Sequence, residues 1–234
     1  MQHQDPQTIF TDNDEYTSIL CCHEDLMLYN EHHGASSSSR LILIPDVSRS
    51  ISGQVIDWNS PDTMINDADD DWIQDIAYSN TLKCYLILNR SRLRLLDKET
   101  YRLEEFYQFP DHSMRKVACS DTGIYLVSAS SPSEHNGNEI IVLSYNKTSK
   151  MHKRSADMIS NRHSGYDAQD VAEISDLTIS NSNQLMVSFR QSLLKRVLLQ
   201  IYNTSDDTND WLLVKQLLIS NCWRDNIPYT PRIE

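Results

Sequence analysis

Three stretches of the chain share one pattern of hydrophobic and polar positions. In each stretch, alternating apolar positions lead to a serine, a few polar or turn residues follow, and a dense apolar run comes next. The stretches are IQDIAYSNTLKCYLIL (73–88), MRKVACSDTGIYLVSA (114–129) and ISDLTISNSNQLMVSF (174–189). Their serines, Ser79, Ser120 and Ser180, are 41 and 60 residues apart, a spacing that is typical of a repeated supersecondary unit.

Each copy continues through two further runs. The third run is apolar and ends in a small polar turn, and the fourth run carries outward-facing charge. The third runs are RLRLLDKET, IIVLSYNKTS and VLLQIYNTSD, and the fourth runs are YRLEEFYQF, HKRSADMI and WLLVKQLLI. Earlier in the chain, TSILCCHEDLMLYN, RLILIPDVS and SGQVIDWN follow the same order as a degenerate copy. The pattern therefore indicates four units.

The composition of these runs predicts β-strands. Runs of roughly four to eight residues rich in Ile, Val, Leu and Tyr, separated by Asn, Asp, Ser and Gly, are typical of strands joined by hairpins. The densest runs, residues 85–88 and 184–189, fit central strands covered on both faces. Glu104, Glu105 and Lys215 fit exposed edge strands. Each copy is predicted to form a four-stranded antiparallel sheet, and sheets of this kind must stack.

The repeated unit resembles the WD40-like β-propeller family. VACSDTGIYLVSAS, residues 117–130, is similar to that family's first hairpin, in which a serine, an Asp-Gly type of turn and a strand of small residues succeed one another. The place of the family's Trp-Asp dipeptide is taken by Pro45-Asp46, Leu96-Asp97, Tyr145-Asn146 and Tyr202-Asn203. The resemblance implies an all-β, propeller-like array of about four four-stranded antiparallel blades. The residues that mark the repeat are Ser79, Asp97, Ser120, Asn146, Ser180 and Asn203.

The resemblance divides the chain into three regions. Residues 1–15 are expected to be a flexible N-terminus, residues 16–220 form the blades, and residues 221–234 are a C-terminal extension or the start of a further blade. A ring of seven units needs on the order of 300 residues, so this array is either complete with about four blades or part of a longer ring. Because one unit cannot bury both of its faces alone, we expect an open array either to be marginally stable or to self-associate.

The acidic charge of the chain is concentrated in its first third. Residues 1–75 contain 15 acidic and two basic residues, whereas residues 76–234 contain 18 acidic and 19 basic residues. This distribution disfavours nucleic acid as a partner, because the first third would repel a phosphate backbone. No apolar run is long enough to cross a membrane, and no export signal is visible. Five cysteines without metal-ligand spacing favour a reducing, cytoplasmic or otherwise intracellular setting.

Two segments contain residue types that bind metal ions. Asp67, Asp69 and Asp71 have the spacing of the first three ligands of an EF-hand calcium loop, but Trp72 stands where that loop needs glycine. We favour a solvated acidic loop and keep these aspartates as weak metal candidates. The second segment has zinc-ligand types without a CxxC or HxxxH frame, and we expect its two last histidines in an exposed turn. Its residues are Cys21, Cys22, His23, Glu24, His32 and His33.

Signatures of nucleophilic catalysis are missing from the sequence. It contains no GxSxG elbow and no glycine-rich loop that could cradle a phosphate. Histidines occur in predicted loops, and two of them lie in an insert over residues 149–170 that we expect to be a flexible surface loop. These histidines are His112, His135, His152 and His163.

Two functions are consistent with this pattern. The first is an intracellular protein–protein interaction scaffold without chemistry or a cofactor of its own, whose partners are other proteins, with a basic surface favoured by the acidic first third. The alternative is a propeller-type metal-dependent hydrolase or lactonase with its site at the central channel. The hydrolase needs Asp, Glu or His side chains from several blades to converge on one axis. The residues that line this axis therefore discriminate between the two functions.

Overall fold

The computed structural model describes most of the predicted repeat region. The described residues are 15–23, 26–33, 39–44, 54–56, 73–110, 113–129, 138–146, 149–154, 158, 173–180, 182–191, 196–204 and 211–220. Residues 1–14 and 221–234 lie outside them, so the proposed terminal regions and the limits of the repeat region stay predictions. The sheets of the described residues are built from sixteen β-strands, β1 to β16, whose bounds are given below.

The first two sheets cover the first half of the chain. The first sheet consists of β1 (Glu15–His23), β2 (Leu26–His33), β3 (Ser39–Ile44) and β4 (Gln54–Ile56). The second sheet consists of β5 (Ile73–Ser79), β6 (Cys84–Asn89), β7 (Arg92–Asp97) and β8 (Leu103–Gln108). In both sheets the strands lie in sequence order, and each is antiparallel to the next.

The second half of the chain repeats this topology. The third sheet consists of β9 (Met114–Cys119), β10 (Ile124–Ser128), β11 (Glu139–Leu143) and β12 (Ser149–Arg154). The fourth sheet consists of β13 (Glu173–Ile179), β14 (Gln184–Gln191), β15 (Arg196–Asn203) and β16 (Leu212–Ser220). Four antiparallel sheets of four consecutive strands confirm the predicted all-β array.

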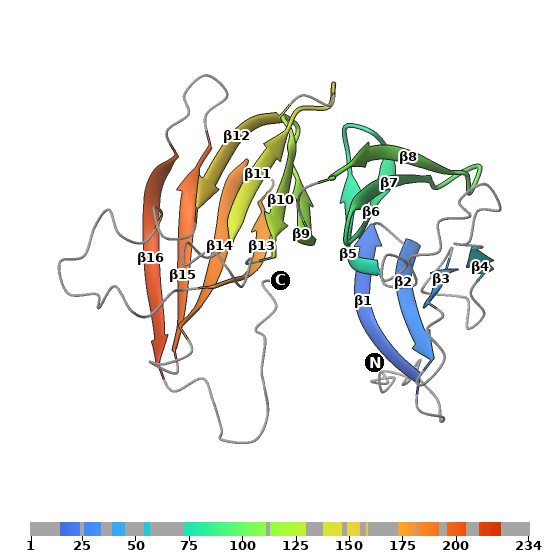
Figure 1. Ribbon diagram of the computed structural model, residues 1–234, viewed down its shortest axis with the longest axis horizontal. Coiled ribbons are helices and arrows are strands. Elements are labelled where there is room, and N and C mark those ends of the chain that lie inside the picture. Colours follow the sequence, from blue (N-terminus) through green and yellow to red (C-terminus); the bar gives the residue numbers. More distant parts are fainter. Residues whose placement is uncertain are drawn as a thin grey trace, which may run out of the picture.

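The four sheets follow one another along an arc (Figure 1). The first and fourth sheets lie at its two ends, and the second and third lie between them. The first strands of neighbouring sheets contact each other in the order β1, β5, β9 and β13. These strands therefore form the inner side of the array, and the later strands of each sheet extend outward from it.

Hydrophobic clusters fill the junctions between neighbouring sheets. Alternate residues of a strand point to opposite faces of a sheet, so one strand serves two junctions. In β10, Ile124 and Leu126 pack in the cluster shared with the second sheet, whereas Tyr125 and Val127 pack in the cluster shared with the fourth sheet. We call the side of a sheet that points to the earlier sheet its preceding face, and the opposite side its following face.

The fourth strand of the third sheet differs from the sequence-based expectation. β12 occupies Ser149–Arg154, where we expected the flexible insert to begin, and it ends within the predicted run HKRSADMI. An edge strand is held through backbone hydrogen bonds to one neighbour, which side chains of any polarity permit. The expectation of a flexible loop is therefore wrong for residues 149–154.

Gly123 lies where the first hairpin of the third sheet approaches β11 closely. A Cβ atom at this position would lie 2.8 Å from the carbonyl oxygen of Leu143, which is closer than two non-bonded atoms of this kind tolerate. Gly123→Ala is therefore expected to lower the free energy of unfolding by about 1–3 kcal/mol, as overpacked sites do. Urea unfolding followed by circular dichroism measures this loss.

Asn80→Ala, in the exposed turn of the corresponding hairpin of the second sheet, is the matched control for the Gly123 variant. It should change the free energy of unfolding by less than about 0.5 kcal/mol, as surface substitutions usually do. Equal losses in the two variants would show that the close approach at Gly123 is not the cause.

Candidate functional site

A β-bulge interrupts the first strand of every sheet at the same repeat position. The residues left unpaired by the register shifts are Ser18, Gln74, Arg115 and Ser175. The residues that follow them are Ile19, Asp75, Lys116 and Asp176. Bulges re-aim side chains and are frequent beside functional sites. Because the first strands form the inner side of the array, these positions are the place to search for a site at the axis.

Asp75, Lys116 and Asp176 form a charge cluster that we call the axial cluster. The Nζ atom of Lys116 lies 3.6 Å from Oδ1 of Asp176, so this ion pair joins the third and fourth sheets. Oδ2 of Asp75 accepts a 2.9 Å hydrogen bond from the backbone N–H of Val117, which joins the second and third sheets. All three side chains are half-buried. Charges removed from water need partners of this kind to offset their desolvation.

The surroundings of Asp75 shift its pKa toward neutral pH. Burial raises the pKa of Asp75 from 3.8 to about 6. The positive charge of Lys116 and the N–H of Val117 oppose this rise, whereas the negative charge of Asp176 adds to it. A carboxyl group with a pKa near 6 has the proton affinity of a general acid or base, and ion networks with a structural role produce the same shift.

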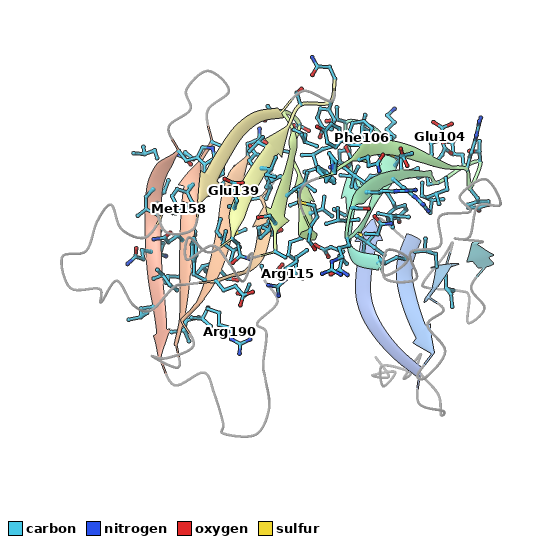
Figure 2. All side chains as sticks on the ribbon, viewed as in Figure 1. Glu104, Phe106, Arg115, Glu139, Met158 and Arg190 are labelled. Carbon is cyan, nitrogen blue, oxygen red and sulfur yellow. The ribbon has the colours of Figure 1, made fainter. Side chains whose placement is uncertain are left out.

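Further polar contacts join the third and fourth sheets near the axial cluster. Nη1 of Arg115, the bulge residue of β9, pairs with Oε1 of Glu173. Figure 2 shows Arg115 toward the inner side of the array, whereas Glu104 lies at the outer side of the second sheet. The side chain of Asn138 donates to the carbonyl of Ser128 at 2.9 Å and accepts from the N–H of Ile174 at 3.2 Å. Inner polar groups thus bond the sheets to one another.

The repeat serines share a structural role. Each hydroxyl oxygen accepts a backbone N–H from its own hairpin turn, and the distances are 3.2 Å from Leu82 to Ser79, 3.1 Å from Thr122 to Ser120 and 3.1 Å from Gln184 to Ser180. The hydroxyl of Tyr145 donates to the carbonyl of Ser120 and lies 3.4 Å from the hydroxyl of Ser79. Tyr145 therefore ties the first hairpins of two neighbouring sheets together.

The polar residues that end the third strands stabilise turns. Oδ1 of Asp97 accepts backbone N–H groups from Thr100 and Glu99 at 2.8 Å each, and these bonds hold the pKa of Asp97 below its usual value. Asn146 accepts a hydrogen bond from the hydroxyl of Ser144. Oδ1 of Asn203 accepts one from the side chain of Gln184 at 3.0 Å. These residues lie on separate sheets and form no common site.

Two thiols near the inner strands are poor nucleophiles. Burial raises the pKa of Cys84 to about 11 and that of Cys119 to about 12. The sulfur of Cys119 also donates a hydrogen bond to the carbonyl oxygen of Tyr78 at 3.0 Å. Both side chains are protonated at neutral pH, whereas nucleophilic catalysis requires the thiolate.

The structure separates most of the predicted zinc ligands. Cys21 and Cys22 lie opposite Leu28 and Met27 near the β1–β2 turn, and at least four residues of strand, about 13 Å, lie between that point and the pair of histidines. His32 and His33 belong to β2, where they pair with Tyr16 and Glu15, so the expectation that they form an exposed turn is wrong. The remaining metal candidates, Glu24, Asp67, Asp69 and Asp71, lie outside the described residues.

Two features are absent from the described ranges. Within those ranges, no three or more His, Cys, Asp and Glu side chains are grouped so that they could hold a metal ion. The same part of the chain contains no helix with the length and apolar character needed to cross a membrane. Of the four histidines in predicted loops, His152 lies in β12, and His112, His135 and His163 lie outside the described residues.

Sequence reasoning missed the axial cluster. A signal was present, because Asp75, Lys116 and Asp176 occupy the third position of the three aligned repeats. This alternation of charge at one repeat position suggests pairing between neighbouring units. The bulges, which bring the three residues to equivalent inner positions, leave no mark in the hydrophobic pattern.

The sequence matches no protein-family model and no curated protein. Its structure is similar to that of a chain in a nidogen/laminin complex, with a TM-score of 0.56 and 9% identity over 89% of this chain and 66% of that chain. For the hydrazine synthase of Kuenenia stuttgartiensis, the TM-score is 0.53 and the identity 9%, over 81% of this chain and 51% of that chain. For the Pan2 WD40 domain of Neurospora crassa, the TM-score is 0.51 and the identity 9%, over 86% of this chain and 49% of that chain.

These similarities support a β-propeller-like fold. The chain spans about half to two thirds of the length of the three solved chains. At such low identity the likeness extends to the fold alone, and one fold serves many activities.

Asp75→Asn is expected to remove one component of the pH dependence of stability. Because burial raises the folded-state pKa of Asp75 to about 6, the folded protein binds this proton more tightly than the unfolded chain. The stabilisation is complete below about pH 4 and is lost as the pH rises to about 6. In urea unfolding, the wild type should lose roughly 1–3 kcal/mol more than D75N over this interval.

Two further variants test the cause of the Asp75 shift. Glu99→Gln removes an exposed carboxylate of the second sheet that lies outside the axial cluster, and it is the matched control for the loss of one acidic group. Lys116→Gln removes the positive charge that lowers the pKa of Asp75, so a carboxyl-carbon NMR titration should show that pKa rising above about 6. A D75N profile parallel to that of the wild type would contradict the assignment.

Proposed function

We propose that this protein is an intracellular scaffold that binds other proteins through a propeller-like array, and that its partners present a basic surface. One observation carries the proposal: the charged groups at the inner positions of the array are bonded to one another or to the backbone of the next sheet. A catalytic group must instead reach the reacting atoms of a substrate. The axial cluster therefore supports a role in joining sheets, which leaves the outer surface for binding.

The charge distribution supports a basic partner. The first third of the chain has a net charge of −13, whereas the rest has a net charge of +1. An excess of acidic charge of this kind raises the association rate of a basic protein and repels an acidic one. The fold by itself does not choose the function, because a hydrazine synthase and a WD40 domain share it.

The alternative, a metal-dependent hydrolase or lactonase at the central channel, is less well supported. Such a site needs oxygen or nitrogen ligands from several blades at equivalent inner positions. Among the four post-bulge positions, Lys116 supplies an ammonium group and Ile19 supplies no ligand. The positive charge of Lys116, 3.6 Å from Asp176, would repel a divalent cation bound at this carboxylate.

Fluorescence anisotropy with labelled oligolysine and oligoglutamate peptides tests the proposal. We expect oligolysine to bind at low salt and more weakly at high salt, and oligoglutamate not to bind. Replacing Asp67, Asp69 and Asp71 with asparagine should weaken oligolysine binding by about threefold or more, because it removes charge from the acidic first third.

A triple variant with the same loss of charge provides the control. Replacing Glu99, Glu104 and Glu105, which are exposed on the second sheet, with glutamine should leave oligolysine binding within about twofold of the wild type. Equal weakening by both triple variants would contradict a role for the first third. Stoichiometric binding of Zn²⁺ or Ca²⁺ in calorimetry, together with metal-dependent hydrolysis of a lactone, would overturn the scaffold in favour of the hydrolase.

A further inference from the structure

Each described junction between sheets joins a following face to a preceding face. Leu86 and Leu88 on the following face of the second sheet pack with Leu126 on the preceding face of the third. Tyr125 and Val127 on the following face of the third sheet pack with Phe189 on the preceding face of the fourth. The chain thus uses one kind of apolar contact repeatedly, and each sheet carries both halves of it.

The following face of the fourth sheet lies at one end of the array and is mainly apolar, and it includes the charged residues Arg190 and Lys215 (Figure 1). Leu198 and Tyr202 pack against the third sheet, so the alternate residues of β15, Leu199 and Ile201, lie on the following face. Leu217 of β16 pairs with Leu199 and shares this face, with 41% of its surface exposed. Burying one large apolar side chain contributes roughly 1.5–3 kcal/mol of stabilisation, which an exposed side chain lacks.

The edge strand of the fourth sheet carries a single charged residue, Lys215. β8, the corresponding strand of the second sheet, exposes Glu104 and Glu105. β16 instead exposes five large apolar side chains, Leu212, Val214, Leu217, Leu218 and Ile219. Contiguous exposed apolar residues on an edge strand mark a surface that associates.

The first sheet, at the other end of the array, carries the complementary face. Cys21 and Leu41 pack in the junction with the second sheet, so alternate positions lie on the preceding face. The backbone register places seven apolar residues there, and the face continues at one end with a directly opposite pair of unlike charges, Glu31 and Arg40. The apolar residues are Leu20, Cys22, Met27, Tyr29, Ile42, Ile44 and Val55. The two ends of the array are therefore the two halves of the contact that every internal junction uses.

We propose that two copies of this chain close a single ring of eight sheets. The following face of the fourth sheet of each copy packs on the preceding face of the first sheet of the other copy. We assign both end faces to a second copy of the chain, because the chain itself carries both halves of the contact. Propellers contain roughly four to eight blades, so two arrays of four reach a size that closes. A head-to-tail contact of this type ends in a closed ring when its rotation allows.

Light scattering coupled to size-exclusion chromatography tests the ring. The full chain is expected to elute as one species with twice the 27.0 kDa mass of a single chain. Leu217→Glu, on the following face of the fourth sheet, should reduce this species to the mass of one chain, because it buries a charge at both junctions. Tyr29→Glu, at a preceding-face position of the first sheet, should do the same.

Mixing the two variants separates a head-to-tail ring from other dimers. The L217E copy keeps an unchanged first sheet, and the Y29E copy keeps an unchanged fourth sheet, so a mixed pair retains one intact junction. An equimolar mixture should therefore recover a species of twofold mass that contains both variants, which mass spectrometry identifies. This recovery also shows that both variants are folded.

Leu218→Glu is the matched control for the L217E variant. Leu218 is the next residue of β16, is 49% exposed, and pairs with Leu198 on the opposite face of the sheet. L218E should remain at twofold mass. Three results would each overturn the ring: a wild-type chain that elutes with the mass of one copy, an open-ended series of larger masses, or equal effects of L217E and L218E.

Discussion

A four-stranded sheet with two apolar faces cannot bury both of them alone, and this constraint governs the whole structure. β6 and β10 are buried along their entire length because each has a neighbouring sheet on either side. Stacking the sheets along an arc covers each internal face with another, so the same contact recurs from junction to junction. The faces at the two ends of the arc have no neighbouring sheet in a single array, and in the proposed ring two copies associate through them.

Stacking also determines how the polar groups on the inner strands are paired. Bulges in β5, β9 and β13 bring Asp75, Lys116 and Asp176 to equivalent positions, where burial makes unpaired charge costly. These charges are satisfied between sheets, and the same is true of Arg115 with Glu173. The members of this network bond to one another or to the backbone and join neighbouring sheets. Under the proposed function, recognition takes place on the outer surface.

Local features of the fold were open to prediction from the sequence. The repeat serines accept hydrogen bonds from residues only two to four positions away, so a short window contains all that their turns need. The dense apolar runs of β6 and β14 likewise identify central strands. β12 and the end of β2 escaped prediction because backbone pairing alone extends them, and polar side chains such as those of His32 and His33 permit it.

The amino-acid sequence by itself determined the repeated unit, its strands and the apolar character of both faces, because these depend on alternation over a few residues. Only the tertiary structure decided which polar residues meet. Asp75 and Lys116 are 41 residues apart in the chain, and Lys116 and Asp176 are 60 apart. Their pairing, and the pKa of Asp75 near 6, depend on burial and on distances between sheets. Neither the pairing nor the pKa can be predicted from a local sequence pattern, because desolvation and Coulomb energy depend on distances in space rather than on separation along the chain.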